Sequence, residues 1–253
     1  MITVKSQQEI QKMRASGLIA AAAQDVVKRE IRPGVTTKYL SDVAEETIRS
    51  MGAIPNFKGM YGFPAAACIS VNEEVIHGIP SDKKILREGD LISIDLGAVL
   101  DGYHSDTAMT FPVGEVSKED ALLIAVTRQS FFEGMKFATH GNRLSDVSHA
   151  IQAYAEANGF SVVREFTGHG IGTELHEDPS IPNYGNPGRG PRLVAGMTLA
   201  IEPMINAGTH RVRVLPDRWT VVTADGKRSA HYEHTVLITK EKPVLLTASK
   251  EDR

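Results

Sequence analysis

Cysteine is almost absent from this chain, since its 253 residues include only one, Cys68. A single cysteine excludes an internal disulfide framework and is typical of a reducing compartment. The chain also lacks a long apolar segment, because the longest run near its start, Leu18 to Ala23, is far too short to span a bilayer. Residues Met1 to Lys5 show no apolar core of a signal peptide. We therefore expect a cytoplasmic protein with no membrane partner.

A strong excess of charge of either sign is missing as well. The formal net charge is -3, and lysine and arginine form no stripe along the sequence. These features argue against a nucleic-acid partner, which would select for a basic surface. A hydrophobic content of 42% is enough for a sizeable core, and no proline- or serine-rich linker divides the chain. We predict one catalytic domain over residues 1–253.

Four segments have helical character and form two pairs. Ser6-Gln7-Gln8-Glu9 has the capping-box pattern that opens a helix, and Arg32-Pro33-Gly34 ends that helix. Apolar residues recur with helical spacing over 37–51. The plan of a long helix followed by a shorter one returns at 118–137 and 144–158. The sequence thus predicts the same helix pair twice.

Two short sequence echoes support a duplication. Leu40-Ser41-Asp42-Val43 begins one short helix, and Leu144-Ser145-Asp146-Val147 begins the other. A glycine that starts an apolar strand with a carboxylate at its end occurs as Gly89 to Asp95 and again as Gly196 to Glu202. Two echoes in register make an internal repeat plausible.

Repeated units of helix, helix and strands predict an α+β fold. We expect an antiparallel sheet with helices on one face, built from two pseudo-symmetric halves at approximately 1–115 and 116–253. Since no linker separates the halves, they are expected to share a single domain.

Two aspartates fall on one face of a predicted β-hairpin. Asp101-Gly102 lies between two apolar runs and is a strong signal for a two-residue turn. With that turn, Gly97 pairs with Asp106, and Asp95 shares the face of Gly97. Diagonal neighbours lie about 5–8 Å apart, so the two carboxylates would raise each other's pKa unless a cation lay between them. The alternative is a solvated hairpin with two surface acids, although the apolar run around Asp95 argues against it.

Two glutamates occupy similar positions later in the chain. Glu202 ends an apolar strand, and Glu233 lies within an alternating strand predicted over 229–238. A carboxylate in such a strand is unusual unless it binds something. His231 and His234, in the same predicted strand, are interpreted as ordinary strand residues.

A histidine between glycines forms another candidate site. Gly168-His169-Gly170 follows a strand-like segment, and the two glycines let a ligand or a second backbone approach the imidazole of His169 closely. The segment does not have the spacing of a nucleotide-binding loop, and 174–179 leads towards a proline-rich loop where such a loop would need a helix. The sequence also contains no H-E-x-x-H motif, which argues against a zincin.

Together these residues resemble the type I methionine aminopeptidases, in the short bacterial form, of peptidase family M24. The resemblance covers nearly the whole chain and keeps several spaced motifs in order, which makes it very specific. It implies the pita-bread fold and the activity of a metal-dependent methionyl aminopeptidase. The matching motifs are Val75-Ile76-His77-Gly78-Ile79-Pro80, Asp95, Asp101-Gly102-Tyr103-His104-Ser105-Asp106, Gly168-His169-Gly170-Ile171-Gly172, His176-Glu177-Asp178-Pro179, Ile201-Glu202-Pro203-Met204 and Tyr232-Glu233-His234-Thr235.

The resemblance implies five ligands for two divalent metal ions. Asp106 and Glu233 would bridge both ions, Asp95 would complete one site, and His169 and Glu202 would complete the other. Four carboxylates and one imidazole form a hard, oxygen-rich set that suits manganese, iron or cobalt, with zinc as an alternative.

The implied reaction is removal of the N-terminal methionine from nascent proteins whose second residue is small. Two ions about 3.5–4 Å apart lower the pKa of a bridging water, so that hydroxide is available near neutral pH. Glu202 is the candidate for moving the proton of this nucleophile to the leaving amine. His176 is expected to donate to the oxyanion, and His77 to contact the substrate.

The predicted methionine pocket contains Met60, Phe63, Cys68 and Trp219, together with the two histidines of the site, His77 and His176. The sequence departs from the family here, because Met60-Tyr61-Gly62-Phe63-Pro64 stands where Tyr-His-Gly-Tyr-Pro is common. The flexible side chain of Met60 can still line a pocket for methionine. Ordinary core packing is the alternative role for the apolar members of this set.

The family also binds a monovalent cation, sodium or potassium, through backbone oxygens. The matching positions are Asn72, Glu74 and Ser229. Backbone ligation leaves no side-chain pattern in the sequence, so this site is implied by the resemblance alone.

Two other functions are compatible with the same fold. Peptidases that cleave before proline usually carry a large extra N-terminal domain, for which this chain has no room. An inactive pita-bread binding module would lose metal ligands, whereas all five are present. We therefore expect a monomeric peptidase that acts on the N-termini of nascent polypeptides near the ribosome.

Overall fold

Helices form where the sequence predicts them. The computed structural model describes residues 1–249. Its helices have bounds close to the predicted ones: α1 (Gln7–Glu30), α2 (Thr37–Ser50), α3 (Lys118–Met135), α4 (Leu144–Ala157) and a short 3₁₀ turn, η1 (Met60–Gly62).

Polar side chains define where three of these helices begin. The hydroxyl of Ser6 accepts a hydrogen bond from the backbone N–H of Glu9, and the Glu9 carboxylate accepts one from the N–H of Ser6, which completes the predicted capping box. Thr36 and Ser117 accept from the N–H groups three residues later at the starts of α2 and α3. Each such cap stabilises a helix by about 1 kcal/mol, because it satisfies a backbone donor that the helix itself leaves unpaired.

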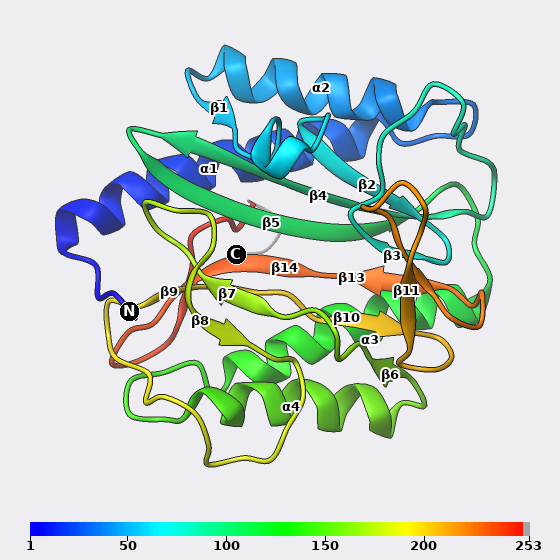
Figure 1. The fold of residues 1–253 in the computed structure, drawn as a ribbon. Coiled ribbons are helices and arrows are strands. Elements are labelled where there is room, and N and C mark those ends of the chain that lie inside the picture. Colours follow the sequence, from blue (N-terminus) through cyan, green and yellow to red (C-terminus); the bar gives the residue numbers. More distant parts are fainter. Residues whose placement is uncertain (250–253) are drawn as a thin grey trace.

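One antiparallel sheet of nine strands runs through the molecule (Figure 1). Its order is β1-β4-β5-β14-β9-β7-β8, with β2 beside β4 and β15 beside β14. The strands of this sheet are β1 (Ile54–Pro55), β2 (Ala67–Val71), β4 (Leu91–Leu100), β5 (Tyr103–Pro112), β7 (Gly168–Gly170), β8 (Glu177–Ile181), β9 (Thr198–Ile201), β14 (Glu233–Leu237) and β15 (Val244–Leu245).

Two smaller antiparallel sheets have three strands each. Their orders are β13-β10-β6 and β11-β12-β3. Their strands are β3 (Glu74–Ile76), β6 (Ser161–Val162), β10 (Met204–Asn206), β11 (Val212–Val214), β12 (Val221–Thr223) and β13 (Ser229–His231).

Each helix pair packs against its own part of the large sheet, so that α1 and α2 lie on one side of the strands in Figure 1 and α3 and α4 on the other. Leu40 of α2 shares a core with Ile94 of β4, and Phe131 of α3 and Ile151 of α4 share another with Leu199 of β9. All five side chains are almost completely buried. Burying such a side chain contributes about 1.5–3 kcal/mol, so each core stabilises the packing of one helix pair on its strands.

The large sheet is continuous across the two predicted halves. Strand β5 of the first half pairs with β14 of the second, with Glu233 opposite Ala108 and His234 opposite Thr107. The predicted α+β class is confirmed, with antiparallel sheets and a helix pair for each set of strands. The division into halves near residue 115 and the single domain stay predictions.

The predicted continuous strand over 229–238 is wrong. It breaks at Tyr232 into β13 and β14, which belong to different sheets. The backbone N–H of Tyr232 donates to the carbonyl of Pro203, and its ring packs against Phe131 with centroids 5.3 Å apart. Alternation of apolar residues is a local property, so it cannot reveal that a strand changes its pairing partner.

The predicted loop at 174–179 is partly wrong as well. Its last residues enter β8, which includes Pro179. Because β8 is the last strand in the sheet order, the missing N–H of proline is tolerated there.

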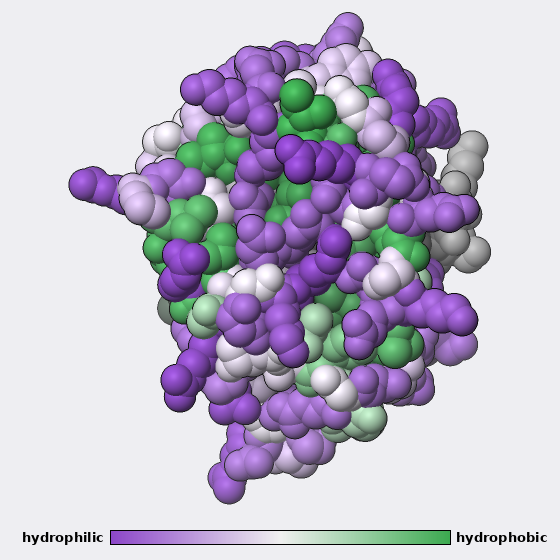
Figure 2. Space-filling view, turned by 90° about the vertical axis from the view of Figure 1, so that its right-hand side faces the viewer, coloured by the Kyte–Doolittle hydropathy of each residue, from purple (hydrophilic) through white to green (hydrophobic). Residues whose placement is uncertain are grey.

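The face of the molecule drawn in Figure 2 shows no extended apolar patch that would pack against another layer. That face is mainly hydrophilic, and its apolar side chains form small separate groups. Such scattered groups are normal on a folded protein. Across the part of the chain that the structure describes, no helix combines the length and hydropathy needed to cross a membrane.

Candidate metal centre and substrate pocket

The hairpin around Asp101-Gly102 has the predicted register. Both turn residues have positive φ, 50° for Asp101 and 78° for Gly102, as a tight two-residue turn requires. The pairs are Leu100 with Tyr103, Gly97 with Asp106 and Asp95 with Ala108. The turn therefore places the carboxylates of Asp95 and Asp106 on the same face of the sheet.

Strand β14 adds Glu233 beside this hairpin. Glu233 lies opposite Ala108, the same residue that pairs with Asp95 on the other side. The hydroxyl of Thr235 accepts from the Asp106 N–H at 2.9 Å and donates to the Asp106 carbonyl at 2.9 Å. These two bonds fix the backbone that carries Asp106 against the strand that carries Glu233.

His169 reaches the same place from β7, which follows β14 and β9 in the order of the sheet. It lies on β7 opposite Ala200 of β9, and flanking glycines make this possible. A Cβ atom on Gly168 would lie 2.3 Å from the Ala200 carbonyl oxygen, and one on Gly170 would lie 2.1 Å from that of Asp178. The glycines thus serve the close approach of neighbouring backbones, one of the two roles predicted for them.

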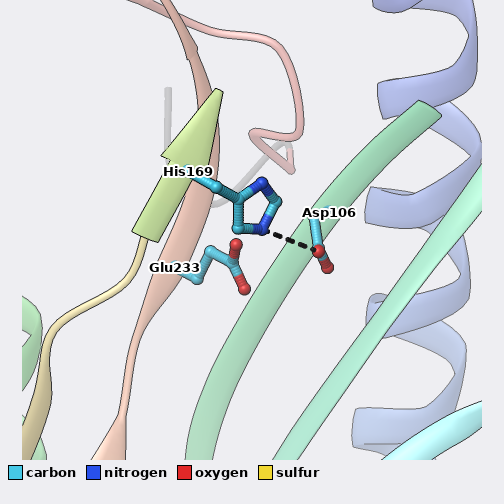
Figure 3. Close-up of side chains that lie close together, drawn as sticks. All are labelled: Asp106, His169 and Glu233. Atoms are coloured by element: carbon cyan, nitrogen blue, oxygen red, sulfur yellow. Dashed lines mark ion pairs between the residues drawn. The ribbon is translucent and has the colours of Figure 1, made fainter. Parts of the chain in front are cut away.

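The imidazole of His169 points towards the carboxylates of Asp106 and Glu233 (Figure 3). One ligand atom from each of these three residues lies within 4.8 Å of the others. The His169 Nδ1 lies 2.8 Å from the Gly170 carbonyl, which leaves Nε2 facing the cluster. Nε2 is 3.8 Å from Asp106 Oδ2 and 3.7 Å from Glu202 Oε1. These separations are too long for hydrogen bonds and leave space for an ion between the groups.

Several oxygens of the cluster lack a partner within the protein. Among residues 1–249, one buried oxygen each of Asp95, Asp106 and Glu233 makes no hydrogen bond. Buried carboxylate oxygens without partners are costly, and divalent cations are their natural ligands. The donor set of four carboxylates and one neutral imidazole therefore fits divalent metal ions.

Burial disfavours the charged form of these carboxylates when no cation is bound. It raises the pKa of Asp95 to about 7 and the pKa of Glu202 to about 8. The pKa values of Asp106 and Glu233 also lie well above the ordinary range, because of burial first and the neighbouring carboxylates second. Burial lowers the pKa of His169 to about 4, so its ring is neutral, the form that binds metals.

All of the predicted side-chain site residues line one cavity of about 460 Å³. Its polar lining includes the five candidate ligands together with His77 and His176. The His176 ring lies 4.4 Å from that of His169, and His77 contacts Phe166 and Trp219 edge-on. Its apolar wall includes the predicted Met60, Phe63, Cys68 and Trp219, and Phe57 and Leu175 in addition.

Two of the three positions implied for a monovalent cation, Asn72 and Ser229, are joined by a backbone hydrogen bond. The Asn72 carbonyl accepts from the Ser229 N–H at 2.9 Å, and Glu74 begins the neighbouring strand β3. The Glu74 carboxylate itself bonds to the Val71 N–H and to Lys84. The cation site stays a prediction.

His231 borders the site, although its strand position gave it an ordinary role. Its side chain is almost completely buried, its Nε2 lies 3.6 Å from Glu202 Oε2, and that nitrogen makes no hydrogen bond within residues 1–249. Strand periodicity could have found it, because His231 lies two residues before Glu233. His234, in contrast, bonds to the Tyr232 and Thr247 hydroxyls in the core and has the structural role predicted for it.

Comparison with known proteins shows what the whole chain is similar to. The model of the family described as Metallopeptidase family M24 matches residues 11–240. The chain is 56% identical to a methionine aminopeptidase of Clostridium perfringens, covering 99% of this chain and 100% of that protein. It is 54% identical to methionine aminopeptidase 1 of Bacillus subtilis, covering 95% of this chain and 96% of that protein.

Solved structures show the same relationship. The methionine aminopeptidase of Thermotoga maritima superposes with a TM-score of 0.97 at 47% identity, covering 98% of this chain and 100% of that one. The prolidase of Pyrococcus furiosus shares the fold, with a TM-score of 0.80 at 24% identity, and this chain covers 66% of it. The predicted pita-bread fold is thereby confirmed.

Proposed function

Because the chain belongs to metallopeptidase family M24 and, within it, to the methionine aminopeptidases, we propose that it removes the N-terminal methionine from nascent proteins whose second residue is small. The observation that carries this proposal is the group of buried carboxylates with unpartnered oxygens that lines a partly apolar cavity. In such a cavity, bound metal cations can contact the amine and the carbonyl of a peptide substrate. The apolar wall can contact the side chain of the first residue of that substrate.

We propose that Asp95, Asp106, His169, Glu202 and Glu233 hold two divalent metal ions, with Asp106 and Glu233 shared between them. Manganese, iron or cobalt suits this donor set, with zinc as an alternative. When bound, such ions supply Lewis acidity and make a water nucleophilic near neutral pH. The central position of Asp106 and Glu233, within reach of His169, supports the sharing.

The protein's own groups then handle protons and orientation. In this proposal Glu202 takes a proton from the attacking water and passes it to the leaving amine. His176 lines the cavity next to His169, and we propose that it donates to the carbonyl oxygen as negative charge develops there. His77 packs edge-on against Trp219 and Phe166, and we propose that it contacts the bound peptide.

The apolar wall fits a methionine side chain. Phe57, Phe63, Cys68 and Trp219 offer the aromatic and sulfur contacts that a thioether favours, and Met60 can adapt its shape to the ligand. Tyr61 lies at the rim, since it lines the cavity with a relative exposure of 81%, and it stacks on His176 with centroids 6.3 Å apart. We infer that this pair narrows the entrance and limits the second residue of the substrate to a small side chain.

Peptide hydrolysis by the metal-loaded protein tests the proposal. With manganese or cobalt, methionine should be released from peptides that begin Met-Ala or Met-Gly and retained on peptides that begin Met-Lys. Cleavage of Xaa-Pro peptides, or no release with any of the four metals, would contradict the proposal. Metal analysis of protein prepared without added metal would identify the native ion, and the oligomeric state in solution would test the expected monomer.

A further inference from the structure

Lys5 is a buried cation outside the metal cluster. Its side chain is only 5% exposed, and its ammonium donates to Glu177 Oε2 at 2.6 Å and to the hydroxyl of Thr3. The backbone N–H of Lys5 donates to the Gly196 carbonyl at 2.8 Å, and Ser6, the next residue, caps α1. Lys5 is therefore held between the start of α1 and the segment that leads into β9.

Glu177 joins Lys5 to a loop of the cavity wall. While its Oε2 accepts from Lys5, its Oε1 accepts from the N–H groups of Thr173 at 2.9 Å and Glu174 at 3.4 Å. The loop packs tightly on this pair, because a Cβ atom on Gly172 would lie 2.4 Å from both Glu177 Oε1 and Lys5 Cε. Burial alone would raise the pKa of Glu177, but these bonds outweigh it, and the pKa lies below its ordinary value.

His176 lines the cavity, together with its neighbours Leu175 and Glu177. It directly precedes Glu177, and its ring lies between Tyr61, 6.3 Å away, and His169, 4.4 Å away. Within residues 1–249 no hydrogen bond holds the His176 ring, so its position depends on the backbone of residues 172–177. Glu177 is the side chain that organises that backbone.

We propose that Lys5, acting through Glu177, is a positioning residue for His176 in peptide hydrolysis. The inference rests on the proposed role of His176 as a donor to the substrate carbonyl. Without the Lys5 ammonium, the Glu177 carboxylate keeps only the hydrogen bond from the Thr3 hydroxyl, at 2.8 Å, as its link to the segment before α1. This neutral bond is weaker than the lost ion pair, so His176 no longer stays aligned with the bound peptide. A displacement of about 1 Å is enough to slow a reaction by about 100-fold.

The experiment compares kcat and KM of the manganese-loaded protein on a Met-Ala peptide for Lys5→Met, His176→Ala and the double variant. Lys5→Met should lower kcat by about 10- to 100-fold and change KM less than about threefold, because the alignment matters mainly in the transition state. In the His176→Ala background, Lys5→Met should have no further effect on kcat, since both changes remove the same interaction. The matched control is Lys38→Met, which removes an exposed lysine from its pair with Asp42 on α2.

A second variant covers the case in which Lys5→Met fails to fold with an unpaired Glu177. Lys5→Met/Glu177→Gln removes both charges, so it should fold like the parent and bind manganese with the same affinity in calorimetry. Its kcat should still be reduced, because the anchor to residue 5 is missing. A parental kcat in this folded variant would overturn the proposal and leave the pair with a structural role only.

The outcomes separate the two proposals. If His176→Ala keeps the parental kcat, the proposed role of His176 fails, whatever Lys5→Met does. If His176→Ala lowers kcat but Lys5→Met does not, only the inference about Lys5 fails. If the effects of the two single variants on kcat multiply in the double variant, Lys5 acts independently of His176, and the inference is again overturned.

Discussion

The metal cluster and the Lys5–Glu177 pair both bury charge, but they differ in how that charge is satisfied. Lys5 and Glu177 find all of their partners within the chain, in each other, in Thr3 and in the backbone. Asp95, Asp106 and Glu233 keep buried oxygens that nothing in residues 1–249 satisfies. A buried charge that the chain completes by itself stabilises structure, whereas one that it leaves incomplete marks a ligand site.

The largest effect should follow removal of a central ligand. We expect Asp106→Asn to lower kcat/KM by about 10³-fold or more, which corresponds to about 4 kcal/mol of transition-state stabilisation. The same variant should bind manganese more weakly in calorimetry, because a carboxylate shared between the ions is lost. In the metal-free state at pH 8 it should unfold at a higher urea concentration than the parent, since a buried anion is costly there.

The matched control for this variant lies on the same hairpin. Asp101→Asn makes the same chemical change at the exposed turn, where asparagine also accepts positive φ. Its kinetics and metal affinity should equal those of the parent. Full activity in Asp106→Asn would remove Asp106 from the metal site.

The next effect concerns the pH dependence of the metal-free protein. The carboxyl pKa values are about 7 for Asp95 and about 8 for Glu202, above the values of about 4 in an unfolded chain. Below about pH 6.5 the buried histidines act in the opposite direction, because burial lowers the pKa of His77 and His169 to about 4. From about pH 7 to pH 8 the histidines are mostly neutral in both states, so the folded state binds more protons than the unfolded state and stability falls as pH rises through that window. Since one pKa unit corresponds to about 1.4 kcal/mol, we expect a loss of a few kcal/mol.

Urea unfolding with a chelator at pH 7 and pH 8 measures this loss. Saturating manganese should reverse the trend, because metal binds the deprotonated carboxylates and the folded state. We expect no such loss of stability from the Lys5–Glu177 pair, because the pKa of Glu177 lies below its ordinary value. Equal stability of the metal-free protein at the two pH values would show that the cluster is solvated like a surface group.

A smaller effect should follow crowding of the internal pair. In Gly172→Ala the new methyl group meets the ends of the Lys5 and Glu177 side chains, which can move aside but only by lengthening their contact. We expect a loss of about 1–2 kcal/mol in unfolding free energy, measured in urea with metal bound. No change in stability would mean that the pair tolerates displacement and cannot hold the loop firmly.

The two regions also differ in how well sequence predicts them. Asp95 and Asp106 could be placed together because Asp101-Gly102 fixes the register of a local hairpin, and register fixes the face of every side chain. The helices were predictable for the same reason, since caps and periodicity are local. The roles of His169, Glu202 and Glu233 came from the resemblance, because their meeting depends on the order in which β14, β9 and β7 join the sheet.

Contacts between distant segments explain what was missed. Lys5 meets Glu177 across most of the chain, and nothing in the pattern around either residue points to the other. Strand alternation places His231 on the face of Glu233, but its approach to Glu202 depends on the pairing of β13 with β10, which is a tertiary event. Pairings of this kind are set by packing of the whole fold and leave no periodic signal.

The smallest effect should come from an ion pair on the surface. Lys38 and Asp42 form an i,i+4 pair on α2 at 2.6 Å, close to the distance between Lys5 and Glu177, but both side chains are about half exposed. Water already solvates these groups, so Lys38→Met should change Tm by less than about 2 °C and leave kcat unchanged. Lys5→Met makes the same chemical change at a buried site. If it changes Tm and kcat more than Lys38→Met does, burial of the ion pair accounts for the difference between the two variants. Equal shifts in Tm for the two variants would contradict the distinction between internally completed and solvated charge.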